Sequence, residues 1–308
     1  MFKEEAGNVS GIKILVCCHR SYPVPEYPFL LPIQVGSVLS DKRFPGFLYD
    51  DSGENISYKN PRYCELTAQY WAWKNMKASH VGFFHYRRYL CPGSHPGGVY
   101  CIRRAPPTSR VLDRLGYENF PRIIEQYDMI LPRGEDMHMS VREHYANAPW
   151  HHARDMELIQ NILRERYPQM EQAMEQYLSG TICYFGNIYI MSWDTFCNYS
   201  AWLFPALAEF DQRADLSGYS AQERRVDGYL AERMLGIYYT YYKSTLKTLE
   251  LPRVHFYDGQ EFAWHRVQNM LLPPGSRRRS AAKRWKRRVL NDPSGTNGLM
   301  PGSNCGKN

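Results

Sequence analysis

The chain has 308 residues, of which 44% are hydrophobic and 22% charged, so it can build a large core and is not an intrinsically disordered protein. Of the net charge of +7, residues 271–308 carry +8 (nine Lys or Arg and one Asp), which leaves −1 for the rest of the chain. A near-neutral body gives little support for nucleic-acid binding, and we expect no nucleic-acid partner.

The eight cysteines include no C-x-x-C pair, so the usual spacing of zinc ligands is absent. Cys17 and Cys18 are adjacent in an apolar run, where they would point to opposite faces of a strand. Disulfides remain open, but buried reduced thiols are the preferred interpretation and fit a cytoplasmic protein. Residues 1–11 contain no apolar signal segment, and no window reaches the ~18 apolar residues of a membrane span.

Strands and helices alternate along the chain after this N-terminal extension. The predicted strands are 12–19, 80–89, 127–133 and 181–191. The predicted helices are 61–76, 156–178 with an interruption at Pro168, 193–214 with a break near Pro205, and 221–242. Residues 49–60 form a turn-rich loop, and residues 92–122 form an irregular excursion. This order predicts one α/β domain over 12–271, with a mostly parallel sheet flanked by helices.

Residues 272–308 change character and are predicted to be a basic, disordered tail. Residues 277–288 form a basic cluster around Trp285. This segment is either a solvated tail or a peripheral contact with an anionic membrane surface, which would hold the protein at the inner face of the membrane.

Basic residues stand where two of the predicted strands end. His85, Arg87 and Arg88 close the apolar run that begins at residue 80, and Arg133 closes the next strand. Ligands of open α/β sheets bind beyond the carboxyl ends of the strands, and the Arg guanidinium matches phosphate oxygens. The pattern favours an anion site over ordinary pairing with surface acids.

Two longer runs, KNPRYCELTAQYWAWKN and GFFHYRRYL, resemble a family of bacterial capsule and exopolysaccharide proteins. The family was described as a domain of unknown function (DUF4422) and is grouped with β-1,3-galactofuranosyltransferases. The agreement continues through IKILVCCH, REHYANAPWHH, YFGNIYIM and QERRVDGYLAERMLGIY, over roughly residues 12–255. The resemblance implies a GT-A-like (Rossmann-type) glycosyltransferase of surface-polysaccharide synthesis. It would transfer galactofuranose, with inversion, from UDP-galactofuranose to a saccharide or lipid-linked acceptor.

In the GT-A fold a strand commonly ends in an Asp-x-Asp motif, which binds a divalent metal on the donor diphosphate. Here the matching strand ends in His85, Tyr86, Arg87 and Arg88, which reverses the sign of the charge. A metal-independent enzyme is therefore expected. Arg87 and Arg88 would stabilise the leaving diphosphate, while His85, Tyr86 and Arg133 would contact the donor.

Other donor-site candidates come from the segment before this strand. Asp50 and Asp51 would form a turn, or Asp51 would bind the donor nucleotide; as a displaced metal motif they would instead indicate an enzyme that needs Mn²⁺ or Mg²⁺. Glu65 and Gln69 lie one helical turn apart and would face either the donor sugar or solvent.

On the acceptor side, residues 144–152 are rich in His but lack a clear zinc-site spacing, so contacts with acceptor hydroxyls are preferred for His144, Tyr145 and His151. Asn187 is assigned to the same side, from a strand that resembles an acceptor-side strand of the fold.

An inverting transferase needs a general base near the acceptor hydroxyl. Glu223, Asp227 and Glu232 are the candidates in the last long helix. Glu232 matches the family motif best, although pairing with Arg225 or Arg233 would make it structural. Arg224 and Arg225 are further candidates for the phosphates.

Two other functions stay open. The first is a metal-dependent hexosyltransferase that uses another UDP-sugar. The second is a non-catalytic module that binds a glycan or a membrane through the basic tail.

Overall fold

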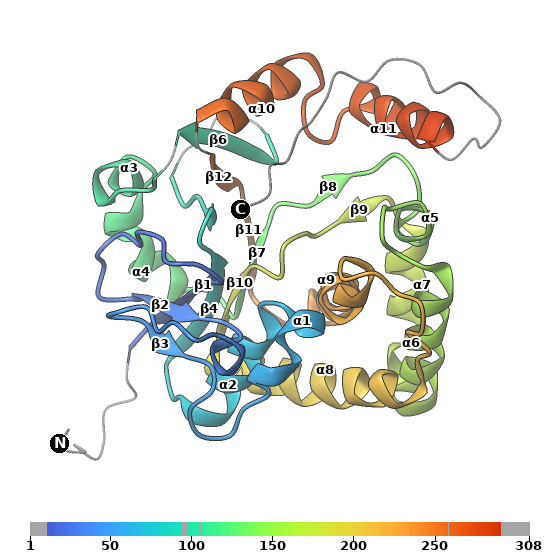
Figure 1. The fold of residues 1–308 in the computed structure, drawn as a ribbon, viewed down its shortest axis with the longest axis horizontal. Coiled ribbons are helices and arrows are strands. Elements are labelled where there is room, and N and C mark those ends of the chain that lie inside the picture. Colours follow the sequence, from blue (N-terminus) through green and yellow to red (C-terminus); the bar gives the residue numbers. More distant parts are fainter. Residues whose placement is uncertain (1–10, 94–97, 105, 258, 291–308) are drawn as a thin grey trace.

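The computed structural model describes residues 11–93, 98–104, 106–257 and 259–290. A ten-stranded sheet crosses the molecule, with its main strands in the order β11-β7-β10-β4-β1-β2-β3 (Figure 1). Their bounds are β1 Lys13–Cys18, β2 Leu30–Gln34, β3 Leu48–Tyr49, β4 His80–His85, β7 Met129–Pro132, β10 Tyr189–Ser192 and β11 Thr248–Leu251. The sheet continues past the end of β4 through β5 (Arg88–Leu90), β12 (Arg253–Tyr257) and β6 (Tyr100–Arg104). A separate pair joins β8 (Glu135–Asp136) and β9 (Ile182–Cys183).

The sheet is mixed but mostly parallel. β1 pairs in parallel with both β2 and β4, β2 with β3, and β7 with β11. β10 lies antiparallel between β4 and β7, so those two strands share one direction. The predicted α/β architecture, a mostly parallel sheet flanked by helices, is confirmed.

Helices cover both faces of the sheet. The larger face carries α1 (Asn60–Tyr63), α2 (Leu66–Asn75), α5 (Val141–Ala146), α6 (Ala153–Arg166), α7 (Glu171–Ser179), α8 (Trp193–Arg213) and α9 (Val226–Tyr242). The opposite face carries α3 (Ser109–Asp113) and α4 (Phe120–Ile124). Cys17 packs in the first core and Cys18 in the second, as their adjacency on a strand predicts.

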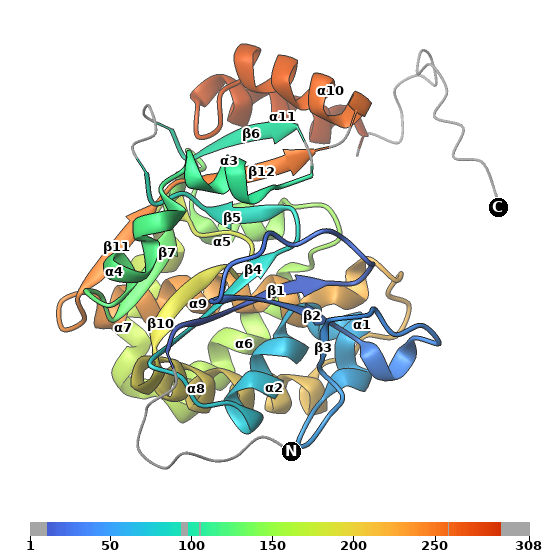
Figure 2. The same cartoon turned by 90° about the vertical axis from the view of Figure 1, so that its left-hand side faces the viewer.

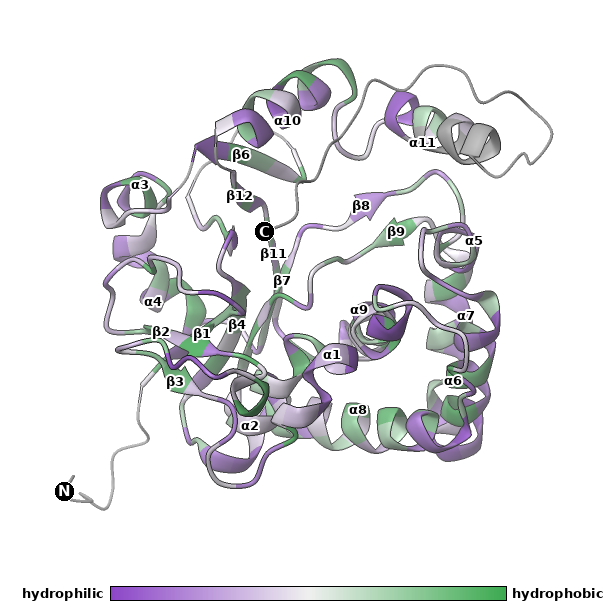
Figure 3. Ribbon diagram, viewed as in Figure 1, coloured by the Kyte–Doolittle hydropathy of each residue, from purple (hydrophilic) through white to green (hydrophobic). Residues whose placement is uncertain are grey.

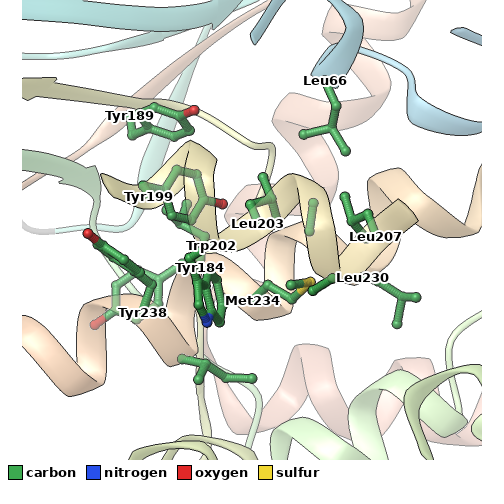
Figure 4. Packing of buried hydrophobic residues seen from close by; sticks show 14 of the residues in the cluster. Leu66, Tyr184, Tyr189, Tyr199, Trp202, Leu203, Leu207, Leu230, Met234 and Tyr238 are labelled. Carbon is green, nitrogen blue, oxygen red and sulfur yellow. The ribbon is translucent and has the colours of Figure 1, made fainter. Parts of the chain in front are cut away.

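The larger core is rich in aromatic residues. Trp202 and Leu203 of α8 meet Met234 and Tyr238 of α9, and Tyr189 of β10 closes the cluster (Figure 4). Pro205 lies inside α8 without ending it, which corrects the predicted break. The carbonyl four residues earlier belongs to Ala201, which is exposed, so water can replace the hydrogen bond that proline cannot donate.

Two predicted elements are divided where the backbone adopts positive φ. The helix expected over 61–76 breaks between α1 and α2, because Cys64 has φ 51°. Asn60 Nδ2 donates to the Cys64 carbonyl at 2.8 Å and fixes this turn. The strand expected over 181–191 breaks at Gly186 and Asn187, which have φ 98° and 48°. Both breaks lie at the same edge of the sheet.

The strand expected over 80–89 also divides. β4 ends at His85, Tyr86 and Arg87 form a turn, and the chain returns as β5. The excursion expected over 92–122 contains β6, α3 and α4.

Two helices follow at the C-terminal side, α10 (Gly259–Leu271) and α11 (Arg277–Leu290), and α10 lies over β6 and β12 (Figure 2). The predicted disordered tail is therefore wrong for residues 277–290. Ala281, Ala282 and the Arg-rich sequence favour a helix, and Ser276 Oγ accepts from the Arg279 amide at 3.2 Å at its start. Residues 1–10 and 291–308 lie outside the described residues. In the part of the chain that the structure describes, no helix is long and apolar enough to cross a bilayer.

Candidate functional site

The carboxyl ends of the parallel strands meet at one edge of the sheet. His19 follows β1, Tyr86 follows β4 and Arg133 follows β7, while the turn at Asn187 leads into β10 at the same edge. Open α/β sheets bind ligands at this edge, so it is the candidate site.

Basic side chains from several segments gather at this edge, and we call them the basic cluster: His19, His85, Arg87, Arg88, Arg225, Arg253 and His255. Burial, followed by neighbouring charges of which Arg88 and Arg87 are the largest, holds the pKa of His85 well below its usual value. Burial and Arg253 act in the same direction on the pKa of His255. Both imidazoles are therefore neutral at pH 7, and the arginines supply the positive charge.

The arginines of the basic cluster differ in whether their guanidinium groups already bind other protein groups. Arg87 Nη1 lies 3.2 Å from Glu261 Oε2 in α10, and Arg225 Nε donates to Cys64 Sγ at 3.2 Å. Within the described residues, no hydrogen bond or ion pair involves the guanidinium of Arg88. A partly exposed guanidinium with unused donors at a strand end suits a phosphate group.

The remaining donor-side candidates take different positions. Tyr86 is 2% exposed, and the guanidinium carbons of Arg20 and Arg87 lie 5.1 and 5.3 Å from its ring centre. Arg133 Nη1 donates to the Gly98 carbonyl at 3.1 Å. Arg224 Nε donates to the Tyr219 carbonyl at 3.1 Å, so of the pair 224–225 only Arg225 joins the basic cluster.

Sequence reasoning missed His19, Arg253 and His255. Arg253 is buried, with Nη2 3.6 Å from Glu135 Oε2, and the His255 ring stacks on Tyr100 at 4.3 Å. Arg253 and His255 alternate with Val254 and Phe256, a pattern that places both polar residues on one face of a strand. From this alternation, the sequence could have predicted a further strand that brings polar side chains to the site.

Two carboxylates accompany the basic cluster. Glu65 begins α2 at the Cys64 turn, and its charge acts on Cys17 at the end of β1 and on Arg225. Glu232 Oε1 accepts from the Gly186 amide at 2.7 Å, and its Oε2 lies 2.7 Å from Arg233 Nη1. Glu232 therefore forms the ion pair with Arg233 that the sequence left open, and these two contacts hold its carboxylate beside the Asn187 turn.

The other two candidate bases lie elsewhere. Asp227 is fully buried, with Oδ2 2.9 Å from Arg62 Nε, and burial together with Asp211 raises its pKa. An acceptor hydroxyl cannot reach it. Glu223 Oε1 lies 3.0 Å from His152 Nε2, and both residues line an open cavity of about 470 Å³.

The two aspartates of the 49–60 loop bind protein groups. Asp50 is fully buried, and its oxygens accept from four donors: the amides of Gly36 (2.8 Å) and Ser37 (2.9 Å) and the hydroxyls of Ser57 and Thr67 (both 2.6 Å). Asp51 forms a two-bond ion pair with Arg43, at 2.9 and 2.5 Å. Asp50 thus fixes the loop to α2, and Asp51 pairs at the surface.

Asp50→Asn is expected to lower the free energy of unfolding by about 2 kcal/mol, because one carboxylate oxygen becomes an amide that faces two donors. Urea unfolding measures the change. The exposed Asp41→Asn is the matched control and should stay within about 0.5 kcal/mol of wild type. Unchanged stability with a loss of donor binding would instead place Asp50 in the donor site.

Gln69 and Asn187 stabilise each other's position. Gln69 is 1% exposed; its Nε2 donates to the Asn187 carbonyl at 3.3 Å, and its Oε1 accepts from the Tyr189 hydroxyl at 2.9 Å. Asn187 Nδ2 donates to the Gly228 carbonyl at 3.0 Å. Both side chains hold the turn before β10, which differs from the expected direct contacts with donor and acceptor.

Two of the acceptor-side candidates, His144 and Tyr145, lie against Arg233. Its Nη2 lies 3.5 Å from His144 Nδ1, and its guanidinium carbon lies 5.3 Å from the buried Tyr145 ring. His151 stacks on Tyr229 at 4.2 Å and is partly exposed. Of these candidates, His151 has the best access from solvent.

Across residues 11–93, 98–104, 106–257 and 259–290, His, Cys, Asp and Glu nowhere form a group of three or more that could hold a metal ion.

Comparisons with known proteins fit this architecture. A family model described as "Domain of unknown function (DUF4422)" matches residues 13–243. A solved apo structure of WbbM, a bifunctional glycosyltransferase, is 31% identical with a TM-score of 0.76. The match covers 81% of this chain but 46% of WbbM, so the chain spans about half of that protein. No curated protein matches. Because the family model covers most of the chain, the protein belongs to the DUF4422 family.

Proposed function

We propose that this protein is a glycosyltransferase that uses a nucleoside-diphosphate sugar as its donor. The observation that carries the proposal is the basic cluster at the carboxyl ends of β1 and β4. There the guanidinium of Arg88 has no hydrogen bond or ion pair to any residue that the structure describes, and Arg87 and Arg225 lie near it. The likeness to WbbM, a bifunctional glycosyltransferase, supports the same class of reaction.

The reaction that we propose is a single displacement at the anomeric carbon. The acceptor oxygen forms a bond to that carbon while the bond to the diphosphate oxygen breaks, and the nucleoside diphosphate leaves with the electron pair. Arg87, Arg88 and Arg225 would neutralise the charge that develops on the diphosphate. Glu232 would take the proton from the acceptor hydroxyl, and the configuration would invert.

Glu65 is the alternative base. It lies at the same edge of the sheet and, among the described residues, no hydrogen bond to its carboxylate is present. Glu232, in contrast, accepts a hydrogen bond from the Gly186 amide and pairs with Arg233, which would fix its position.

We further propose that the reaction is metal-independent. The fixed arginines would do what a divalent ion does in related enzymes. The rival proposal, Mn²⁺ or Mg²⁺ on Asp50 and Asp51, is weakened because protein donors already surround both carboxylates.

The proposed donor is UDP-galactofuranose, and the proposed acceptor is a saccharide or lipid-linked glycan of surface-polysaccharide synthesis in the cytoplasm. The family resemblance supports this choice of sugar. His151, the cavity beside His152 and Glu223, and the Asn187 turn would form the acceptor side.

The experiment that tests the function supplies UDP-galactofuranose, UDP-galactopyranose and UDP-glucose separately, with a galactose-containing oligosaccharide acceptor. We expect mass spectrometry to find a hexose added to the acceptor only with UDP-galactofuranose. Transfer from another donor would keep the reaction class and change the sugar. Turnover of none of the three, while UDP still binds, would contradict the proposed donor set.

A further inference from the structure

Exposed apolar side chains concentrate on α10. Trp264 is 67% exposed, Val267 47%, Met270 72% and Leu271 61%. Positions 264, 267 and 271 share one face of the helix, and Met270 adjoins it. Figure 3 shows hydrophobic positions along α10 towards its end near α11. Soluble proteins seldom leave such a stripe without a partner.

The neighbouring helix α11 carries the charge. Arg277–Leu290 contains eight Lys or Arg and no acidic residue, and Trp285 on this helix is 69% exposed. Arg279 fixes α11 to α10, because its Nη1 donates to Asn269 Oδ1 at 2.7 Å and to the Leu272 carbonyl at 3.1 Å. The two helices therefore present apolar and cationic groups as one unit.

This unit is attached to the body beside the basic cluster. The Gly275 amide donates to Glu135 Oε1 at 3.2 Å, and Glu261 pairs with Arg87. The His265 ring stacks on Tyr257 at 4.1 Å. A surface that binds α10 and α11 would consequently lie next to the candidate site.

We propose that α10 and α11 form a docking surface for anionic lipid headgroups. The exposed Trp, Met and Leu side chains would enter the headgroup region, and the basic residues of α11 would pair with lipid phosphates. The proposal extends the membrane contact expected for residues 277–288, because it assigns the apolar part of the contact to α10. It does not depend on the proposed glycosyltransferase activity.

Two other occupants fit less well. A second copy of the chain would bring a second helix with eight basic residues against the first, and like charges repel. Residues 291–308 are mostly Gly, Pro, Ser and Asn, and they offer only Leu299 and Met300 as large apolar side chains. Charge and apolar character together favour a lipid surface.

Sedimentation of the full chain with vesicles tests this proposal. We expect binding to phosphatidylcholine vesicles that contain 30% phosphatidylglycerol, weakening in high salt, and little binding to pure phosphatidylcholine. Trp264→Ser/Met270→Ser/Leu271→Ser should lower the partition coefficient at least ten-fold. Val38→Ser/Leu39→Ser, which alters two residues 54% and 57% exposed elsewhere, should leave it unchanged.

A second variant removes charge from exposed positions, so the vesicle test does not depend on whether the α10 variant folds. Arg277→Gln/Arg278→Gln changes two exposed residues and should lower partitioning about 30-fold, since each basic residue contributes ~1 kcal/mol at an anionic surface. Equal binding to both vesicle types, or unchanged binding of both variants, would overturn the proposal. Loss of a dimer in the α10 variant, without any vesicle binding by wild type, would identify a second copy as the occupant.

Discussion

Arg87→Ala/Arg88→Ala is expected to lower kcat/KM for the nucleotide-sugar donor by about 10²- to 10⁴-fold. Each arginine would lose a charge-assisted hydrogen bond to the diphosphate, and such bonds contribute roughly 1.5–3 kcal/mol. The effect should be larger on kcat than on KM, because charge on the diphosphate grows as the glycosidic bond breaks. Steady-state kinetics with purified variants measures it.

The matched control removes two arginines away from the site. Arg166 and Arg213 pair with Glu209 on the surface of α6 and α8, so Arg166→Ala/Arg213→Ala should keep wild-type kinetics. Thermal unfolding of both double variants shows whether the fold survives. A folded Arg87/Arg88 variant with wild-type kcat/KM would place the diphosphate elsewhere.

Glu232→Gln is expected to lower kcat by about 10³-fold, because a general base contributes 10²- to 10⁴-fold. Glutamine retains an oxygen for the Gly186 amide, so the turn before β10 should keep its position. Donor KM should change little, and the acidic limb of the pH–rate profile should disappear.

Glu65→Gln separates the two candidate bases. If Glu232 is the base, Glu65→Gln retains an acidic limb in its pH profile. The opposite result would contradict this assignment. If Glu65→Gln lowers kcat and removes the acidic limb of the pH–rate profile, while Glu232→Gln leaves both unchanged, Glu65 at the start of α2 is the base. Glu157→Gln, which changes an exposed residue of α6 away from both candidate bases, serves as the surface control.

The fold could be predicted from local pattern because strands and helices alternate with clear breakers. The antiparallel direction of β10 could not be predicted, because an apolar run has the same pattern in either direction. Its direction depends on the pairing of β10 with β4 and β7, which are far away in the sequence. The turn at Cys64 was hidden for a similar reason. Its positive φ is fixed by Asn60 and by contact with Arg225, 161 residues away.

The site shows the same division. Arg87 and Arg88 were proposed for the site because they close the strand predicted over 80–89, and strand ends converge. Gln69 was also a polar residue on the helix before this strand and was expected to contact the donor. Its side-chain oxygen instead accepts a hydrogen bond from the Tyr189 hydroxyl, 120 residues away in the sequence. Arg253 joins the basic cluster through the pairing of β12 with β5, which no local pattern specifies.

The most direct test of the basic cluster as a diphosphate site is calorimetric binding of UDP in excess EDTA. We predict that wild-type protein binds UDP without metal, that affinity falls as salt rises, and that Arg88→Ala lowers affinity at least ten-fold. Absence of binding in EDTA, with binding restored by Mn²⁺ and unchanged in Arg88→Ala, would contradict the account.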